Sequence, residues 1–163
     1  LDEGVQLGPM ADARGLETAR AMISDARDRG AELLAGGGTP AGLEAGYFLE
    51  PTVLGLVPDD ARIMLEEPFA PVAPITTFND MDEALARANS LSFGLAGYVF
   101  TSSLRTAHLV SDELECGMVG VNEMLLATAE APFGGIKESG MGREGGSLGI
   151  MDYLVPKYVK MKL

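Results

Sequence analysis

Apolar residues near the start of the chain recur at the spacing of one helix face, with Arg, Glu and Asp between them. The apolar positions are Leu16, Ala19, Met22, Ile23 and Ala26. This pattern predicts an amphipathic helix that ends before Gly30, because a glycine after the last periodic residue commonly stops a helix. Residues 32–35 then predict a short strand, and the glycines at 36–38 predict a turn.

Strand-like and helix-like stretches alternate through the middle of the chain. The strand-like stretches are residues 47–57, 72–78, 94–101 and 118–122. A capping box at residues 80–83 predicts a helix from Met81 to Ser90, and Ser102 or Ser103 would cap a second helix that reaches Leu114. Alternation of this kind predicts an α/β fold, with a mainly parallel sheet and helices on its faces.

Two of the strands carry a further expectation. Pro51 cannot donate a ladder hydrogen bond, so residues 47–57 predict an edge strand or an interrupted strand. Residues 72–78 are mostly apolar and predict a buried strand.

The end of the chain changes its periodicity. Residues 142–154 predict a short helix that glycines weaken. In residues 155–163, Val159, Met161 and Leu163 alternate with polar or aromatic neighbours, which predicts a strand. An unpaired terminal strand invites association with another chain, and its lysines would restrict that pairing to the right partner.

Composition and charge narrow the class of protein. The chain has 163 residues, of which 47% are hydrophobic, and this fits one globular domain. The net charge of −12 disfavours nucleic acid as a partner. We expect neither a membrane span nor a signal peptide, because the start is not basic and no apolar run approaches about eighteen residues. The single cysteine excludes an internal disulfide and suits the cytoplasm.

Residues 130–146 match neither a helix nor a strand. Six of them are glycine, which predicts an ordered and tightly turned loop. Phe133 lies between Pro132 and a Gly-Gly pair, where a solvent loop would not place a large aromatic ring. From this pattern alone, Phe133 is either a plug for the core or part of a pocket wall.

A second informative stretch is Glu66-Glu67-Pro68-Phe69-Ala70-Pro71. The two prolines fix the backbone, so a carboxylate and an aromatic ring are held in a rigid relation. A carboxylate accepts two hydrogen bonds at once, which suits a vicinal diol such as a ribose. The alternative is a solvated acidic turn with one Phe in the core.

Residue types that are often catalytic, metal-binding or phosphate-binding in other proteins do not indicate such a site in this chain. Cys116 directly follows acidic residues that disfavour a thiolate, so we do not interpret it as a nucleophile. His108 has no motif partner, and one His with one Cys cannot assemble an ordinary zinc site. No Gly-Lys-Ser/Thr follows the glycines at 36–38, so a phosphate loop is not favoured there. The sequence therefore predicts no catalytic and no metal-binding residue.

Several ordered motifs resemble those of the aldehyde dehydrogenase superfamily. They are Leu7-Gly8-Pro9-Met10, residues 47–53, 66–72 and 120–123, and Pro132-Phe133-Gly134-Gly135-Ile136-Lys137-Glu138-Ser139-Gly140-Met141-Gly142-Arg143-Glu144-Gly145. Within the superfamily, residues 121–146 and 149–153 are most similar to the succinate-semialdehyde dehydrogenase branch. The resemblance implies that residues 1–154 are the C-terminal part of an aldehyde dehydrogenase catalytic domain and that 155–163 form an oligomerisation tail.

The resemblance also implies roles for individual residues. Glu67 would bind the hydroxyls of the nicotinamide ribose, and Phe69 would border the nicotinamide. Phe133 would belong to the aromatic wall around the aldehyde. Ala127 stands where the succinate-semialdehyde branch places a Ser that holds the substrate carboxylate, and Thr128 is the alternative donor. Ala70 stands where the family usually has Gly.

The function implied by the resemblance is NAD- or NADP-dependent oxidation of an aldehyde to the carboxylic acid, with succinate semialdehyde as a candidate substrate. The nucleophilic Cys and the general-base Glu would lie upstream of Leu1. We therefore expect an inactive fragment of an enzyme that forms a homodimer or homotetramer. The alternative, from a different class, is a non-catalytic α/β interaction module expressed alone. NAD and NADP are not distinguished, because the residues around the adenosine ribose would lie upstream.

Overall fold

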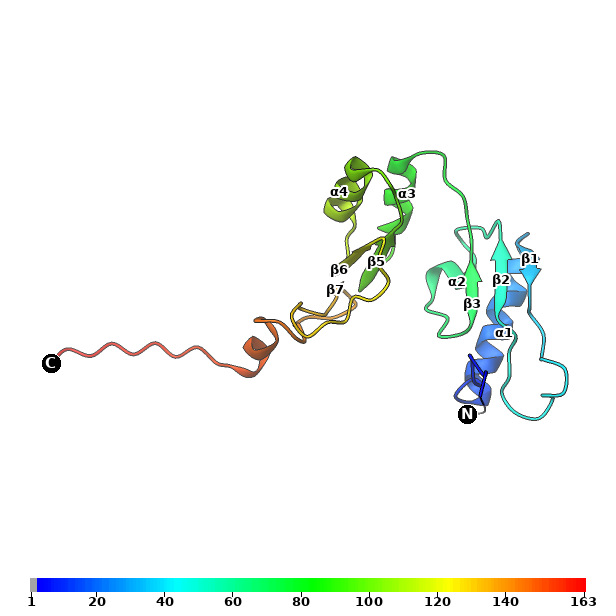
Figure 1. Ribbon diagram of the computed structural model, residues 1–163, viewed down its shortest axis with the longest axis horizontal. Coiled ribbons are helices and arrows are strands. Elements are labelled where there is room, and N and C mark those ends of the chain that lie inside the picture. Colours follow the sequence, from blue (N-terminus) through cyan, green and yellow to red (C-terminus); the bar gives the residue numbers. More distant parts are fainter. Residues whose placement is uncertain (1–2) are drawn as a thin grey trace. The chain divides into compact units, whose positions relative to one another are not determined.

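The computed structural model describes residues 3–163 and divides the chain into two compact units. The first unit ends at Thr77, and the second comprises Phe78–Leu163. Figure 1 shows the helices and strands of each unit. Every helix in the described chain falls short of the length and apolar character that crossing a membrane requires.

The first helix forms where the apolar periodicity predicted it. Helix α1 spans Ala13–Asp28, and the Asp12 side chain caps it by accepting a 2.8 Å hydrogen bond from the Gly15 N–H. Its C-cap is Arg29, and Gly30 follows at a φ of 106°, which only glycine adopts without strain. All five apolar residues of the predicted face are buried. The predicted helix and its glycine stop are therefore confirmed.

The buried face of α1 packs on a small mixed sheet. The sheet has the order β1 (Glu32–Ala35), β2 (Thr52–Gly55) and β3 (Val72–Pro74). Strands β1 and β2 are antiparallel, whereas β2 and β3 are parallel. Side chains of the short helix α2 (Arg62–Leu65), of strand β2 and of the segments that flank these elements complete the core with α1, which lies behind the strands in Figure 1. The core members outside α1 are Ala31, Leu49, Leu54, Val57, Ala61 and Ile63.

Strand β2 is the centre of this sheet, so the edge-strand alternative is wrong. Within residues 47–57 only Thr52–Gly55 is strand, which fits the alternative of an interrupted strand. Pro51 lies immediately before β2 and removes no hydrogen bond from its ladder. Strand β3 is only half-buried, and it is shorter than the predicted buried strand at residues 72–78.

The glycine turn at residues 36–38 is held by hydrogen bonds to residues of the same unit. The Gly37 N–H donates to Thr52 Oγ1 at 2.9 Å, and the Gly38 N–H donates to Glu50 Oε2 at 3.0 Å. A Cβ on Gly36 would lie 2.1 Å from the Pro51 carbonyl oxygen, so the backbone approach requires glycine. These N–H groups are occupied by the protein itself, which agrees with the absence of a phosphate-loop motif.

Both α-helices of the second unit begin at capping residues that were predicted from the sequence. Asp80 accepts a 2.9 Å hydrogen bond from the Glu83 N–H at the start of α3 (Met81–Ala88). Helix α4 (Leu104–Glu113) begins at Ser103, whose hydroxyl accepts from the Thr106 N–H at 3.2 Å. Of the two candidate serines, Ser103 is therefore the cap.

The strands of the second unit form two separate pairs. Strands β5 (Ala96–Val99) and β6 (Met118–Val121) are parallel and joined through α4, which is the predicted βαβ connection. Strands β4 (Phe93–Gly94) and β7 (Ile136–Lys137) are antiparallel. A mainly parallel sheet is not confirmed, because the strands described here pair in both directions.

The C-terminal part of the second unit is less regular than the sequence suggested. Only Gly149–Tyr153 is helical, as the short 3₁₀ helix η1. Residues 154–163 form neither helix nor strand (Figure 1). Their side chains are exposed. A strand needs a neighbouring strand for its hydrogen bonds, so pairing of the tail stays a prediction about an assembly.

Candidate functional site

The glycine-rich loop is ordered by a bridge between its two arms. Phe133 and Glu144 exchange two backbone hydrogen bonds of 2.7 Å each. Positive φ angles occur at four of the six glycines of the loop, Gly140, Gly142, Gly145 and Gly146. The tight turns predicted for residues 130–146 are therefore present, and the glycines supply the conformations that other residues disfavour.

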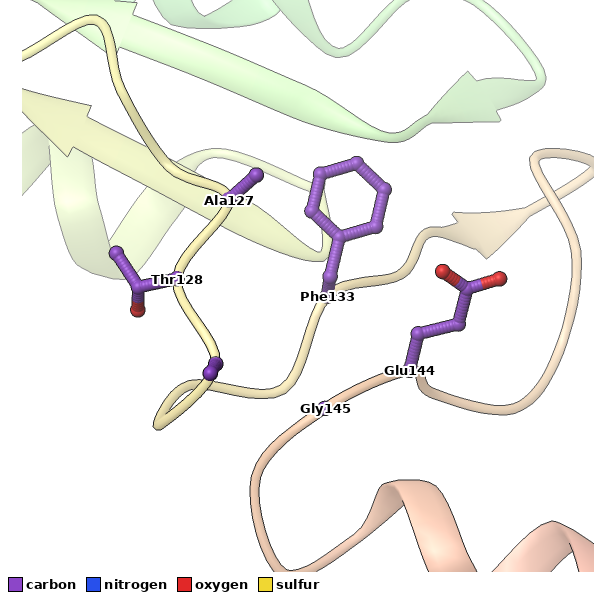
Figure 2. A pocket seen from close by; sticks show the side chains of 6 residues that line it. Ala127, Thr128, Phe133, Glu144 and Gly145 are labelled. Atoms are coloured by element: carbon purple, nitrogen blue, oxygen red, sulfur yellow. The ribbon is translucent and has the colours of Figure 1, made fainter.

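A pocket lies beside this bridge. It is an open depression with a volume of about 370 Å³, which falls in the range of small-molecule sites. Its lining residues are Ala127, Thr128, Ala129, Phe133, Glu144 and Gly145 (Figure 2). The structure thus brings together Ala127, Thr128 and Phe133, the three residues that the sequence analysis assigned to a substrate pocket.

The side chains of these residues differ in direction. In Figure 2 the Ala127 methyl group points toward the Phe133 ring, whereas the Thr128 side chain points away from it. Phe133 is half-buried and lines the pocket, which agrees with the interpretation as a pocket wall.

Sequence reasoning missed three lining residues, Ala129, Glu144 and Gly145, of which Glu144 carries the chemistry. Glu144 is the only ionisable residue in the pocket lining, and its side chain is exposed. In the sequence, nothing distinguishes Glu144 from the other charged residues of the glycine-rich loop. Only the bridge to Phe133, eleven positions away, brings it to the pocket. No local pattern in the sequence indicates that contact.

The two carboxylates of the acidic turn, Glu66 and Glu67, have different surroundings. Glu66 accepts two hydrogen bonds from the Arg62 guanidinium, at 3.0 Å from Nε and 2.9 Å from Nη2. These bonds lower the pKa of Glu66 below its ordinary value. Glu67 is exposed, and no residue in the described part of the chain forms a hydrogen bond or ion pair with its carboxylate. Glu67 is therefore the carboxylate with open acceptor sites.

Phe69 is presented to solvent by a strained turn. Its side chain is 81% exposed and its φ is 38°, an unfavourable value for an aromatic residue. The alternative that Phe69 belongs to the core is therefore wrong for this chain. Ala70 packs against the core and has no positive φ, so its backbone conformation does not require glycine.

The remaining candidates do not form a site. The Cys116 thiol donates a 3.0 Å hydrogen bond to the Met118 carbonyl, and His108 is exposed on α4. Among the described residues, His, Cys, Asp and Glu side chains form no group of three that could hold a metal ion.

A family model described as "Aldehyde dehydrogenase family" matches residues 1–159 of this sequence. The chain belongs to the aldehyde dehydrogenase family. A 3-sulfolactaldehyde dehydrogenase of Pseudomonas putida is 45% identical over 159 residues, which are 98% of this chain and 32% of that protein. The NADP⁺ succinate-semialdehyde dehydrogenase of Escherichia coli is 42% identical over 98% of this chain and 33% of its own length.

Solved structures of aldehyde dehydrogenases have the same fold. A succinate-semialdehyde dehydrogenase from Burkholderia pseudomallei matches with a TM-score of 0.92 and 40% identity, over 97% of this chain and 32% of that one. A betaine aldehyde dehydrogenase of Staphylococcus aureus in complex with NAD⁺ matches with a TM-score of 0.89 and 36% identity, over 95% of this chain and 31% of that one. The aldehyde dehydrogenase fold is therefore confirmed for a chain that spans about a third of the length of these relatives.

Proposed function

We propose that the chain is the C-terminal part of the catalytic domain of an NAD- or NADP-dependent aldehyde dehydrogenase. The reaction converts an aldehyde, water and the oxidised cofactor into a carboxylic acid, the reduced cofactor and a proton. The main support is family membership over residues 1–159, together with the pocket that Ala127, Thr128 and Phe133 line.

This chain would help to bind the nicotinamide part of the cofactor. When bound, the nicotinamide supplies the hydride acceptor of the reaction. Glu67 fits the nicotinamide ribose, because an exposed carboxylate without a protein partner can accept hydrogen bonds from both hydroxyls. Phe69 offers an exposed ring on the same rigid turn. The E. coli relative is named as NADP⁺-dependent and the S. aureus structure holds NAD⁺, so both cofactors belong to the proposal.

The pocket residues bear on the substrate. Phe133 would form an aromatic wall for the aldehyde. Ala127 supplies no hydrogen bond, and the Thr128 side chain points away from the Phe133 ring (Figure 2). Succinate semialdehyde is the candidate substrate, since relatives named for succinate and glutarate semialdehydes match nearly the whole chain. The lining chemistry equally suits an uncharged aldehyde of the same length.

The catalytic groups would be supplied by residues upstream of Leu1. The Cys116 thiol donates a hydrogen bond to the Met118 carbonyl, so its hydrogen already has a partner within the chain. Within the described second unit, Val110 is the only buried apolar side chain, so most apolar side chains there are left for another part of the protein to cover. Both observations support a role within a larger catalytic domain and inactivity of the chain alone.

The test uses the complete protein and the chain alone. Each is mixed with NAD⁺ or NADP⁺ and with succinate semialdehyde or butanal, and the reduced cofactor is followed by its absorbance. We expect aldehyde-dependent reduction by the complete protein and none by the chain alone. Reduction by neither protein with any aldehyde would overturn the proposed function. Turnover by the chain alone would overturn the assignment of catalysis to upstream residues.

A further inference from the structure

Two walls of the pocket are held together by backbone hydrogen bonds. Phe133 lies on one arm of the glycine-rich loop, and Glu144 with Gly145 lies on the other. The two 2.7 Å hydrogen bonds between Phe133 and Glu144 set the separation of these arms. A change in the arm that carries Glu144 therefore changes the width of the pocket at the Phe133 ring.

Arg143, immediately before Glu144, ties the same two arms a second time. Its Nη1 donates to the Gly135 carbonyl at 2.8 Å and to the Gly142 carbonyl at 2.6 Å. A Cβ on Gly134 would lie 2.7 Å from the Gly142 carbonyl oxygen and 2.8 Å from Arg143 Cδ. The arms are so close that only glycine fits between them at this position.

Asp152 anchors the turn from outside the pocket. It belongs to η1, and its Oδ2 accepts a 2.8 Å hydrogen bond from the Arg143 N–H. Gly142 has a φ of 83°, and a Cβ placed there would lie 2.5 Å from the same Oδ2 atom. The carboxylate thus occupies the space of the missing side chain at Gly142 and satisfies the next backbone N–H.

We propose that Asp152 is a positioning residue for the aldehyde pocket. Its hydrogen bond to the Arg143 N–H fixes the turn at Gly142 and so holds Glu144 in register with Phe133. Asp152 does not line the pocket itself. This inference rests on the proposed function, because the pocket is taken to bind the aldehyde.

The decisive comparison is between Asp152→Ala and Asp152→Asn in the complete protein. Asn keeps a side-chain oxygen that accepts the Arg143 N–H, whereas Ala keeps none. For Asp152→Ala we expect the KM for the aldehyde to rise about fivefold, which corresponds to about 1 kcal/mol, with the KM for the cofactor unchanged. Asp152→Asn should restore the aldehyde KM of the parent. Asp112→Ala is the matched control, because Asp112 is exposed on α4 of the same unit and its side chain forms no hydrogen bond with described residues.

Hydrogen exchange provides a readout that does not depend on activity. In Asp152→Ala, amides in peptides covering residues 140–146 should exchange about fivefold faster, while peptides from α1 should be unchanged. If Asp152→Ala does not fold, Asp152→Ser replaces it as the test variant. The serine side chain is too short for its hydroxyl to reach the Arg143 N–H.

The possible outcomes test the positioning role of Asp152 and the proposed function separately. An aldehyde KM and loop exchange like those of the parent in Asp152→Ala would overturn the positioning role. Equal defects in Asp152→Asn and Asp152→Ala would also overturn it, because an acceptor oxygen alone should suffice. If the unsubstituted complete protein oxidised no aldehyde, the proposed function and the substrate role of the turn would both fall. The exchange comparison would then still decide whether Asp152 holds the turn.

Discussion

Glu66 and Glu67 are adjacent in sequence, but only Glu66 has a charged partner. The Arg62 guanidinium binds the Glu66 carboxylate through two hydrogen bonds of 3.0 and 2.9 Å. Glu67 is exposed and forms no such contact with any described residue. The helical i, i+4 spacing explains the difference, because Arg62 opens α2 and reaches the residue that ends it. One carboxylate is thus neutralised locally while the next remains available to a ligand.

The first prediction concerns the available carboxylate. In the complete protein, Glu67→Gln should slow hydride transfer by about tenfold to a hundredfold, because hydrogen bonds to a charged group contribute about 1.5–3 kcal/mol. Adenosine binding should change little, since the proposed contact is to the nicotinamide ribose. Rapid mixing of enzyme, cofactor and aldehyde, with the first turnover followed by absorbance, measures the step directly.

Glu66→Gln is the matched control for this experiment. It makes the same chemical change at the neighbouring residue, where the carboxylate already has Arg62 as its partner. An exposed ion pair of this kind contributes little to stability, so Glu66→Gln should transfer hydride at nearly the rate of the parent. Equal rates for Glu67→Gln and the parent would rule out the assignment of Glu67.

The second prediction concerns substrate choice. Ala127→Ser places a hydroxyl on the side of the Phe133 ring, where Figure 2 shows the Ala127 methyl group. The variant should raise kcat/KM for succinate semialdehyde relative to butanal by about tenfold, because the new donor can bind the substrate carboxylate. Thr128→Val is the control and should leave the ratio unchanged, since the Thr128 side chain points away from that ring. An unaltered ratio in Ala127→Ser would exclude this position from carboxylate recognition.

The third prediction concerns the core of the first unit. Met22 is 2% exposed within the cluster that joins α1 to the sheet. Met22→Ala should destabilise this unit by about 2–5 kcal/mol, because it removes buried atoms and leaves a cavity. Met141 is 100% exposed, so Met141→Ala should change stability by less than about 0.5 kcal/mol. Denaturant unfolding of the complete protein, followed by circular dichroism, compares the two. Similar midpoints for the two variants would contradict the assignment of the core.

The three longer helices, α1, α3 and α4, were the part of the fold that could be predicted from the sequence. Asp80, Ser103 and Gly30 act through neighbours within about four residues, so their capping or stopping roles are visible in a short window. Strand pairing depends on distant partners. Nothing in residues 136–137 indicates that β7 pairs with β4, more than forty positions earlier. The expectation of a mainly parallel sheet failed to be confirmed for this reason.

The candidate site divides in the same way. Phe133, Ala127 and Thr128 were identified because their motifs resemble those of a known family, not because their spacing specifies a pocket. Glu144 was missed, since its place in the lining depends on a backbone bridge across the loop. The strain at Phe69 was also missed, because Ala70 was the residue that differed from the family pattern and Phe69 carries the positive φ.

The last prediction concerns the tail, residues 155–163. Val155, Tyr158 and Met161 are more than four-fifths exposed, and residues 154–163 of this single chain form no strand. An apolar segment with open backbone hydrogen-bonding groups would be stabilised by pairing with a strand of another subunit. We therefore expect the complete protein to be a homodimer or homotetramer, and deletion of residues 157–163 to reduce its mass to that of a smaller assembly.

Light scattering of the complete protein, of the deletion variant and of a matched control tests the role of the tail. The control, Lys160→Gln with Lys162→Gln, keeps the length and the alternating apolar residues Val159, Met161 and Leu163. It should retain the parent assembly, because the backbone hydrogen bonds and apolar contacts of the strand are unchanged. A deletion variant with the same mass per particle as the parent would show that these residues do not hold the subunits together.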